Sequence, residues 1–315
     1  MEKSGEIKGT TLQSTMKAPI VLTAYNRPDY FEQVLDSLSP QCWDRKVYCV
    51  VDGPRFQDDI PLIEKSFQLS RDKIPHCESV ISRSNQGVAK IMKYARELAF
   101  KDNEFVILIE DDSVLQPHYI QQLDFLISKF EDDERIAMIN CFGEHHRSKK
   151  THKYSYLDYS QDQQNKVSIE SQKQNKNKLI LMDHMWAYAM RRSSYEKIYD
   201  ILESYWKLLP KEYRFRPHGE ILKLMSSIGA DPKKIVSSQD SCTSAAFAAR
   251  GMIKISTFTN NFKYIGEIGE HSRPNNFKDA GWCDQDVYDS FHDDFLWNED
   301  VFEEIKLHAK NKYLK

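Results

Sequence analysis

An uninterrupted apolar run that ends in three consecutive carboxylates constrains the fold of this chain more than any other feature. Residues 105–109 are apolar and mostly β-branched, and Glu110, Asp111 and Asp112 follow directly. Such a run is typical of a strand buried on both faces of a parallel sheet, and open α/β sheets bind ligands at the carboxyl ends of their strands. Grouped carboxylates repel one another and lose solvation, and a hard divalent cation such as Mg²⁺ or Mn²⁺ would offset both costs. The alternative is a solvated acidic turn ahead of the next helix.

Apolar runs and amphipathic stretches alternate through the first half of the chain. Strands are predicted at residues 19–24, 46–51, 78–82, 105–109 and 136–140, and helices at about 31–38, 61–69, 88–99 and 117–130. This alternation predicts an α/β fold in which a mostly parallel central sheet carries helices on both faces. The phosphate loops GxGxxG and GxxxxGK[ST] are missing from the sequence, which disfavours dinucleotide-dependent dehydrogenases and P-loop NTPases.

Composition excludes several classes of protein. The chain has 315 residues, 40% hydrophobic and 29% charged, with a net charge of -3, so a general nucleic-acid binder is not expected. No stretch approaches the roughly 20 apolar residues of a membrane span. Residues 1–18 are polar and predict a disordered leader rather than a signal peptide. Six scattered cysteines without a CxxC pair favour a cytoplasmic protein with free thiols.

The second half of the chain follows a less regular pattern. Residues 143–178 are rich in Gln, Asn, Lys and Ser and predict a mobile loop. A strand-like run at 179–182 follows, and residues 183–190 are predicted to cross into a helix whose capping box is Ser193 with Glu196. A further strand-like run at 234–238 precedes a helix lined with small residues.

Six short motifs, in this order, carry a resemblance to a known family: Ala24-Tyr25-Asn26-Arg27, Val51-Asp52-Gly53, Asn85 to Lys90, Ile109 to Ser113, Trp186-Ala187-Tyr188 and Gly269-Glu270-His271. Over residues 19–275 the chain resembles the GT-A-fold glycosyltransferases. Within them it looks like the group related to β-1,2-N-acetylglucosaminyltransferase I, whose pattern bacterial surface-polysaccharide transferases share.

The resemblance implies one continuous GT-A (Rossmann-like) domain with a smaller acceptor-side region at its C-terminal end. Residues 19–142 would bind the nucleotide sugar, and residues 179–315 would supply the catalytic and acceptor side. The implied reaction is metal-dependent, inverting transfer from a UDP-linked donor to a saccharide or lipid-linked saccharide in glycan or surface-polysaccharide synthesis. The implied location is the cytoplasm, with peripheral attachment to the inner face of the membrane left open.

The resemblance also implies a metal site. Asp112 would hold Mn²⁺ or Mg²⁺ under the donor diphosphate, with His271 as the C-terminal ligand. Glu110 and Asp111 would contact the ribose, the sugar or metal-bound water. Arg27 would place a fixed positive charge at the diphosphate, as its charge and fork geometry suit.

Other donor contacts are implied by the same motifs. Asp52 would accept the uracil N–H, although Asp-Gly-Pro is also an ordinary turn sequence. Ala24 and Tyr25 would line the donor site, and so would Lys90, unless Lys90 is a solvated helix residue. Trp186 would stack on a sugar ring, with buried packing as the alternative.

The catalytic base has three candidates in the sequence. An inverting transfer needs one carboxylate to accept the proton of the attacking hydroxyl, and Asp240 fits best, with helix N-capping as the alternative role. Asp183 and Glu220 are the other candidates. The sequence departs from the family here, because Thr243 and Ser244 stand where an aromatic residue is expected after the base.

Two other classes of function compete with a glycosyltransferase. One is a catalytically inactive sugar- or partner-binding protein on the same fold, against which the intact Arg27, Asp52 and Asp112 argue. The other is a Mg²⁺-dependent nucleotidyl- or phosphotransferase, which the missing phosphate loop disfavours.

Overall fold

The apolar runs form an eight-stranded mixed sheet with the order β3-β2-β1-β4-β8-β6-β9-β7. The computed structural model describes residues 17–143, 168–269 and 273–315, and the statements below concern these residues. The strands are β1 (Ile20–Ala24), β2 (Val47–Val51), β3 (Cys77–Ile81), β4 (Phe105–Glu110), β5 (Ser113–Leu115), β6 (Ile136–Asn140), β7 (Leu179–Leu181), β8 (Ala187–Arg191), β9 (Ile253–Thr257) and β10 (Phe262–Tyr264).

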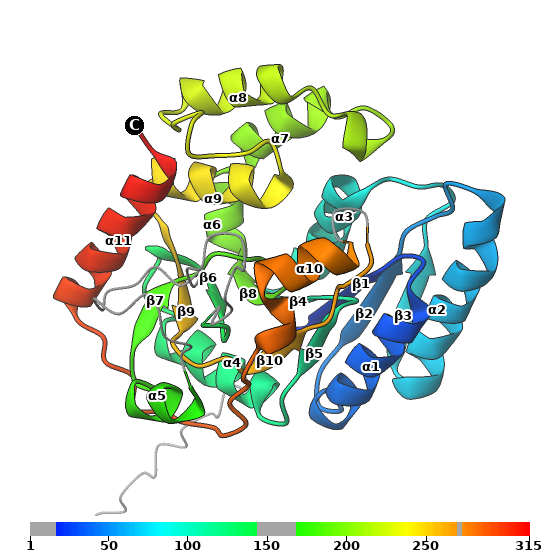
Figure 1. Ribbon diagram of the computed structural model, residues 1–315, viewed down its shortest axis with the longest axis horizontal. Helices are drawn as coiled ribbons and strands as arrows, with labels where there is room; N and C mark the ends of the chain where they lie inside the picture. The colour runs from blue at the N-terminus through cyan, green and yellow to red at the C-terminus, as the bar shows by residue number, and fades with distance from the viewer. Residues whose placement is uncertain (1–16, 144–167, 270–272) are drawn as a thin grey trace, which may run out of the picture.

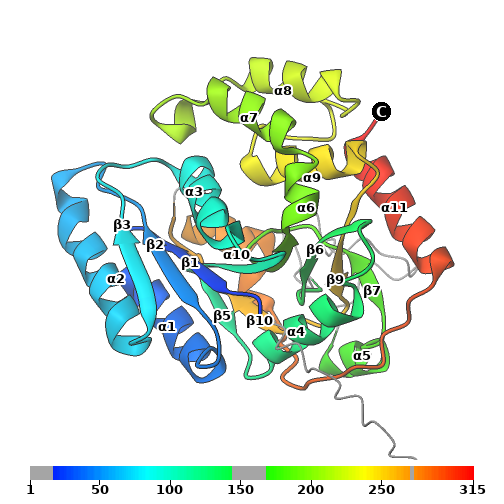
Figure 2. The same ribbon diagram turned by 180° about the vertical axis from the view of Figure 1, so that it is seen from behind.

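Helices flank this sheet on both faces. The helices are α1 (Pro28–Leu38), α2 (Ile60–Lys73), α3 (Val88–Phe100), α4 (Tyr119–Lys129), α5 (Ile169–Gln174), α6 (Arg192–Glu196), α7 (Tyr199–Leu208), α8 (His218–Ser227), α9 (Gln239–Ala249), α10 (Pro274–Ala280) and α11 (Glu299–Tyr313). Helix α10 covers the side that faces the viewer in Figure 1, and α3 covers the side that faces the viewer in Figure 2. The predicted α/β class, with a mostly parallel central sheet, is confirmed.

Strands β1 to β4 pair in parallel as the alternating pattern predicts. The structure differs from the prediction at residues 187–191, which form β8, an antiparallel strand between β4 and β6. The predicted helical crossing there is wrong, and so is the capping box, because α6 begins at Arg192 and Ser193 lies inside it. Ala and Met favour helices in isolation. Here the segment is hydrogen-bonded to one strand on each side, and this pairing outweighs the helical preference.

The end of the predicted mobile loop is also ordered. Residues 144–167 lie outside the described residues, as do residues 1–16 of the predicted leader. Residues 169–174, however, form α5, and the buried side chain of Gln172 accepts a hydrogen bond from the backbone N–H of Asn260 at 2.9 Å. It also donates to the carbonyl oxygen of Asp286 at 3.1 Å. One buried amide side chain therefore joins three segments that are distant in the sequence.

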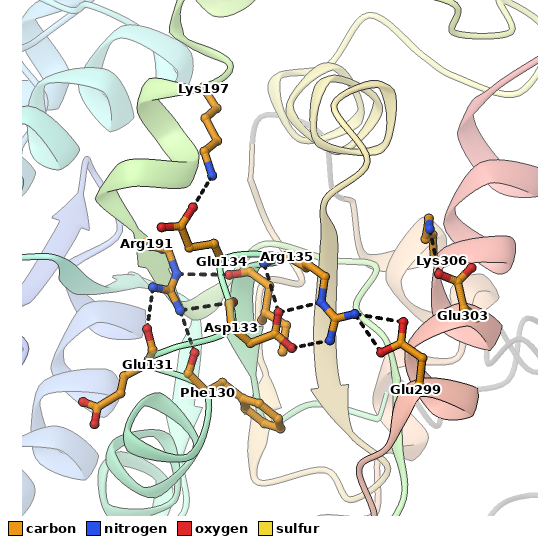
Figure 3. A network of polar contacts seen from close by, with 11 residues as sticks. Phe130, Glu131, Asp133, Glu134, Arg135, Arg191, Lys197, Glu299, Glu303 and Lys306 are labelled. Carbon is orange, nitrogen blue, oxygen red and sulfur yellow. Dashed lines mark hydrogen bonds and ion pairs between the residues drawn. The ribbon is translucent and has the colours of Figure 1, made fainter.

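An arginine at the end of β8 fixes this inserted strand to the rest of the domain (Figure 3). The Arg191 guanidinium donates to the carbonyl oxygens of Phe130 at 2.6 Å and Glu131 at 2.7 Å, which follow the last turn of α4. Nearby, Arg135 bridges Asp133 and Glu299, and Glu299 opens α11. Cationic side chains satisfy carbonyl groups at helix ends in this way, so the network joins β8, α4 and α11.

A two-stranded antiparallel ribbon brings the C-terminal third to the acidic strand end. Strand β10 pairs with β5, with Tyr264 opposite Ser113. Because Ser113 directly follows the acidic cluster, residues 265–269 lie against that cluster.

Candidate active site

The acidic cluster lies at the turn between β4 and β5 and is largely withdrawn from solvent. Asp111 and Asp112 are 5% and 4% exposed. The Oδ2 atom of Asp112 lies 2.9 Å from Nη2 of Arg27. The other carboxylate oxygen of Asp112, Oδ1, is buried and has no hydrogen-bond partner. An unpartnered buried carboxylate oxygen is costly, and such an atom marks a place where a ligand can bind.

Arg27 supplies the positive charge that faces this cluster. It stands at the N-cap position of α1, directly after the turn that ends β1. Its Nε and Nη2 atoms form a two-point contact with the Asp111 carboxylate, in which the Nε to Oδ2 distance is 3.3 Å. Its Nη1 atom donates to the carbonyl oxygen of Ile268 at 3.2 Å. In this structure the guanidinium predicted for the diphosphate is therefore engaged by the acids.

The segment 265–269 packs against the same carboxylates. The carbonyl oxygen of Asp112 accepts a hydrogen bond from the N–H of Ile265 at 2.9 Å. A Cβ atom at Gly266 would lie 2.6 Å from Oδ2 of Asp112, so this approach requires glycine. His271, the predicted second metal ligand, lies outside the described residues.

Burial raises the pKa values of two acids in the cluster. Burial raises the pKa of Asp112 to about 6, even though Arg27 lowers it. Burial raises the pKa of Glu110 well above its usual range, and the charges of Asp112, Asp240 and Asp111 raise it further. The clustered carboxylates therefore raise one another's pKa values, and Arg27 offsets only part of this effect.

The described residues offer part of a metal site. No three His, Cys, Asp or Glu side chains within the described ranges gather as a metal-binding group. The buried, unpartnered Oδ1 of Asp112 nevertheless fits one ligand position. Mg²⁺ commonly takes one or two protein carboxylates and completes its shell with substrate phosphates and water. The residues present thus fit a cation that binds together with a diphosphate.

Asp52 has a different environment from Asp112. Its Oδ1 atom accepts from the N–H groups of Gly53 and Gln86, each at 2.8 Å. Its Oδ2 atom accepts from the N–H of Gly87 at 2.9 Å and from the Asn85 amide at 3.0 Å. These four bonds tie the end of β2 to the segment that starts α3. The predicted uracil contact is not tested by this arrangement and stays a prediction.

The other residues predicted to line the nucleotide-sugar site differ in burial and in hydrogen bonding. Ala24 is buried at the end of β1. The Tyr25 hydroxyl donates to Asp59 at 2.6 Å, and the Asn26 amide donates to the same carboxylate at 2.7 Å. Lys90 is half-buried in the first turn of α3. Asp59, which sequence reasoning missed, therefore holds the motif after β1 in place.

Trp186 packs against aromatic side chains of the chain itself. Its ring stacks on Tyr264 with centroids 3.9 Å apart and on His184 at 4.3 Å, and Trp282 meets it edge-on at 5.0 Å. The packing alternative is the one observed, and the ring helps to join β8 to the β10 ribbon. Tyr188, in the same motif, is fully buried.

Asp240 lies in the first turn of α9. The N-cap of α9 is Ser238, whose side chain accepts from the N–H of Ser241 at 3.3 Å, so Asp240 is not the capping residue. The charge of Asp240 contributes to the raised pKa of Glu110. Burial also raises the pKa of Asp240 itself, against the lowering effect of Lys254. The run at 234–238 forms turns rather than the predicted strand.

The two alternative bases are in unsuitable environments. Burial raises the pKa of Asp183, but the charges of His184 and Lys312 outweigh it and hold that pKa well below its usual range. The Lys312 ammonium lies 2.5 Å from the carboxylate. Glu220 is exposed on α8, which Figure 1 shows at the edge of the molecule, away from β4. A strongly paired acid and a solvated one are both poorer proton acceptors here than Asp240.

Arg96 is a second residue that sequence reasoning missed. It is 0% exposed on α3, and its Nη2 atom donates to the Tyr188 hydroxyl at 3.0 Å. Its Nε and Nη1 atoms have no hydrogen-bond partner. Among nearby charges, that of Asp240 acts on it. The available signal was its place one turn after Met92 on the apolar face of the helix.

Comparison with known proteins identifies the class. The model of Glycosyl transferase family 2 matches residues 20–199, which include β1 to β4, the acidic turn and β8. The chain belongs to glycosyl transferase family 2. A search of curated proteins found no match.

Solved structures of similar architecture are distant in sequence. The mannosyltransferase PcManGT from Pyrobaculum calidifontis, in complex with GDP-Man and Mn²⁺, is 13% identical with a TM-score of 0.42, over 77% of this chain and 55% of that one. Glucosyl-3-phosphoglycerate synthase from Mycobacterium tuberculosis, in complex with Mn²⁺ and UDP, is 15% identical with a TM-score of 0.34, over 58% and 59%. The chain thus spans between half and two thirds of the length of these proteins.

Proposed function

We propose that this glycosyltransferase moves a sugar from a UDP-linked donor to a saccharide hydroxyl with inversion, and that a divalent cation is required. The observation that carries the proposal is the buried, unpartnered carboxylate oxygen of Asp112 at the end of β4. A hydroxyl, amide or backbone N–H could have satisfied that atom, and the fold leaves it for a ligand. The electrostatic contact of Asp240 with Glu110 adds a candidate base on the same site.

The chemistry assigned to the chain's own residues is simple. Asp240 accepts the proton of the acceptor hydroxyl while that oxygen attacks the anomeric carbon and the bond to the diphosphate breaks. A divalent cation at Asp112, when bound, would neutralise charge that develops on the leaving diphosphate. Arg27 adds a second positive charge there. We assign Glu110, the first acid of the cluster, to a contact with the donor.

The hydrogen-bond donors around Asp52 support the proposal that the donor nucleotide carries uracil. Three of the four donors on its carboxylate are backbone N–H groups, which the fold holds in place, and the fourth is the Asn85 side chain. We propose that a ring N–H replaces the Asn85 amide on Oδ2, since a side-chain donor can rotate away. Asn85→Ala should then weaken UDP binding by less than Asp52→Ala does.

The acceptor and the location remain expectations from the family resemblance. A saccharide of a glycan or surface polysaccharide, free or lipid-linked, is the proposed acceptor, as for the N-acetylglucosaminyltransferase I-like group. No helix in the described part of the chain is long and apolar enough to cross a membrane. Peripheral attachment is tested by sedimentation with vesicles of anionic lipid, with neutral vesicles as the comparison.

A panel of nucleotide sugars tests the proposed function. With Mn²⁺ present, release of UDP from at least one UDP-sugar is expected, and the product should show the inverted anomeric configuration by NMR. UDP with Mn²⁺ should raise the melting temperature, whereas ATP with Mg²⁺ should not. UDP binding without turnover on any donor would support the inactive binding protein, and stabilisation by ATP would support the phosphotransferase.

A further inference from the structure

Arg27 contacts both aspartates of the acidic cluster. It bridges Asp111 and Asp112 through Nη2, and its Nε atom reaches the second oxygen of Asp111 at 3.3 Å. Both acids are almost fully buried, and the Arg27 side chain is 24% exposed. The guanidinium is thus the counter-charge of these two carboxylates in this structure.

The same contacts oppose the binding of either ligand alone. A cation at Asp112 would meet the positive charge of Arg27 only 2.9 Å from the Oδ2 atom of that carboxylate. A diphosphate that drew Arg27 away would leave two buried carboxylates without their counter-charge beside further negative charge. Each ligand offsets the cost created by the other, because the cation can replace Arg27 on the acids.

The segment that Arg27 holds on its other side has a second attachment that does not depend on Arg27. Its Nη1 atom holds the segment 265–269 through the carbonyl oxygen of Ile268, and the N–H of Ile268 independently contacts the Tyr30 hydroxyl at 3.2 Å. A Cβ atom at Gly269 would lie 3.0 Å from Nη1. Glycine at that position therefore lets the backbone approach the guanidinium closely, and the Tyr30 contact retains the segment when Arg27 turns.

We propose that Arg27 exchanges partners: it neutralises Asp111 and Asp112 in the empty protein, and it turns to the diphosphate when a cation takes its place on the acids. This inference rests on the proposed function, because it assumes a nucleotide diphosphate and a divalent cation as ligands. It adds that the two ligands bind cooperatively through one side chain, and that Arg27 is a positioning residue for the metal site as well as a donor contact.

Binding measurements on Arg27→Gln test the exchange without using turnover. Mn²⁺ affinity is followed by electron paramagnetic resonance, and UDP affinity by calorimetry, each with and without the other ligand. One charge-assisted hydrogen bond corresponds to about 10- to 100-fold in affinity. Arg27→Gln should bind Mn²⁺ alone about 10-fold more tightly than the unmodified protein does. It should weaken UDP binding by at least about 10-fold with saturating Mn²⁺ and by less than about threefold without it.

Two further variants separate charge and folding from the exchange. Arg27→Lys keeps the charge but loses the two-point contact with Asp111, so its Mn²⁺ affinity should lie between those of the other two proteins. Arg45→Gln removes an arginine that contacts Asp124 at 2.8 and 2.6 Å, away from the acidic cluster. It should lower the melting temperature and leave both affinities unchanged.

The outcomes distinguish the exchange from the proposed function. An equal effect of Arg27→Gln on UDP affinity with and without Mn²⁺ would overturn the exchange, and so would unchanged Mn²⁺ affinity. If neither UDP nor GDP binds the unmodified protein in the presence of Mn²⁺, the proposed function itself fails.

Discussion

Two buried aspartates, which follow β2 and β4 of the same sheet, differ in their hydrogen-bond partners. Asp52, after β2, is 4% exposed and accepts four hydrogen bonds from its own chain. Asp112, after β4, is equally buried but has one oxygen in contact with Arg27 and the other without a partner. Similar positions and similar burial therefore accompany different functions: the carboxylate at β2 organises a loop, and the carboxylate at β4 is held ready for a ligand.

The difference comes from the type of donor that each carboxylate meets. Three of the four donors on Asp52 are backbone N–H groups that the fold holds in place, so most of its hydrogen bonds persist when a ligand replaces the Asn85 amide. Arg27 is a side chain and can leave Asp112 when a competing charge arrives. An active site can thus be recognised by which buried acids have exchangeable partners, in addition to which acids are buried.

The largest expected effect is that of Asp112→Asn on turnover. Loss of the position for a cation at the diphosphate should lower kcat/KM by at least about 10³-fold, since such a cation supplies several kcal/mol of transition-state stabilisation. The stabilising effect of UDP with Mn²⁺ on the melting temperature should also disappear. Circular dichroism of the variant should be unchanged. Full activity of the unmodified protein in excess EDTA would contradict the assignment.

Asp240→Asn extends the comparison to the second half of the domain. The amide keeps the shape of the side chain but cannot take a proton, so turnover should fall by about 10²- to 10⁴-fold. UDP affinity in the presence of Mn²⁺ should change little, because the change is on the acceptor side. Near-native turnover in this variant would place the base elsewhere, and retention of anomeric configuration would exclude a single-base mechanism.

Asp52→Asn should lower stability in addition to its effect on UDP binding. The new amide N–H₂ group would face backbone donors, and burying unsatisfied N–H groups costs about 1–3 kcal/mol each. Urea unfolding should therefore show a clearly lower free energy of unfolding, whereas Asp112→Asn should show no such loss. If both variants were equally destabilised, the contrast between the two carboxylates would be wrong.

The smallest expected effect is a shift in the pH profile of Arg96→Gln. Burial raises the pKa of Asp240, and the charge of Arg96 lowers it. A base must be ionised, so turnover falls as the pH drops through this pKa. Removing Arg96 raises that pKa further, and the acidic limb of kcat/KM should move to higher pH, by about one unit for a nearby buried charge.

Tyr188→Phe is the matched control for that shift. It removes the hydroxyl to which Arg96 donates at 3.0 Å but leaves the charge of Arg96 in place. The acidic limb should then stay where it is in the unmodified protein. A shift of equal size in Tyr188→Phe would assign the effect to packing instead of charge.

Local sequence determined the parallel half of the sheet and the position of the acidic turn. Continuous β-branched runs at β1, β2 and β4 are sufficient to mark buried strands, and polar residues after them mark the carboxyl edge. Residues 187–190 could not be assigned in the same way. Their composition favours a helix. They form a strand because they pair with β4 on one side and with β6 on the other.

The state of each site residue was decided by tertiary structure alone. Nothing near Arg27 in the sequence shows that it meets Asp111, because the two lie 84 positions apart. Trp186 carries an aromatic motif, yet Tyr264 and His184 stack on its ring. The sequence determines which chemical groups stand at the strand ends. Long-range packing determines which of their hydrogen bonds are already made, and hence which atom, Oδ1 of Asp112, is left for a ligand.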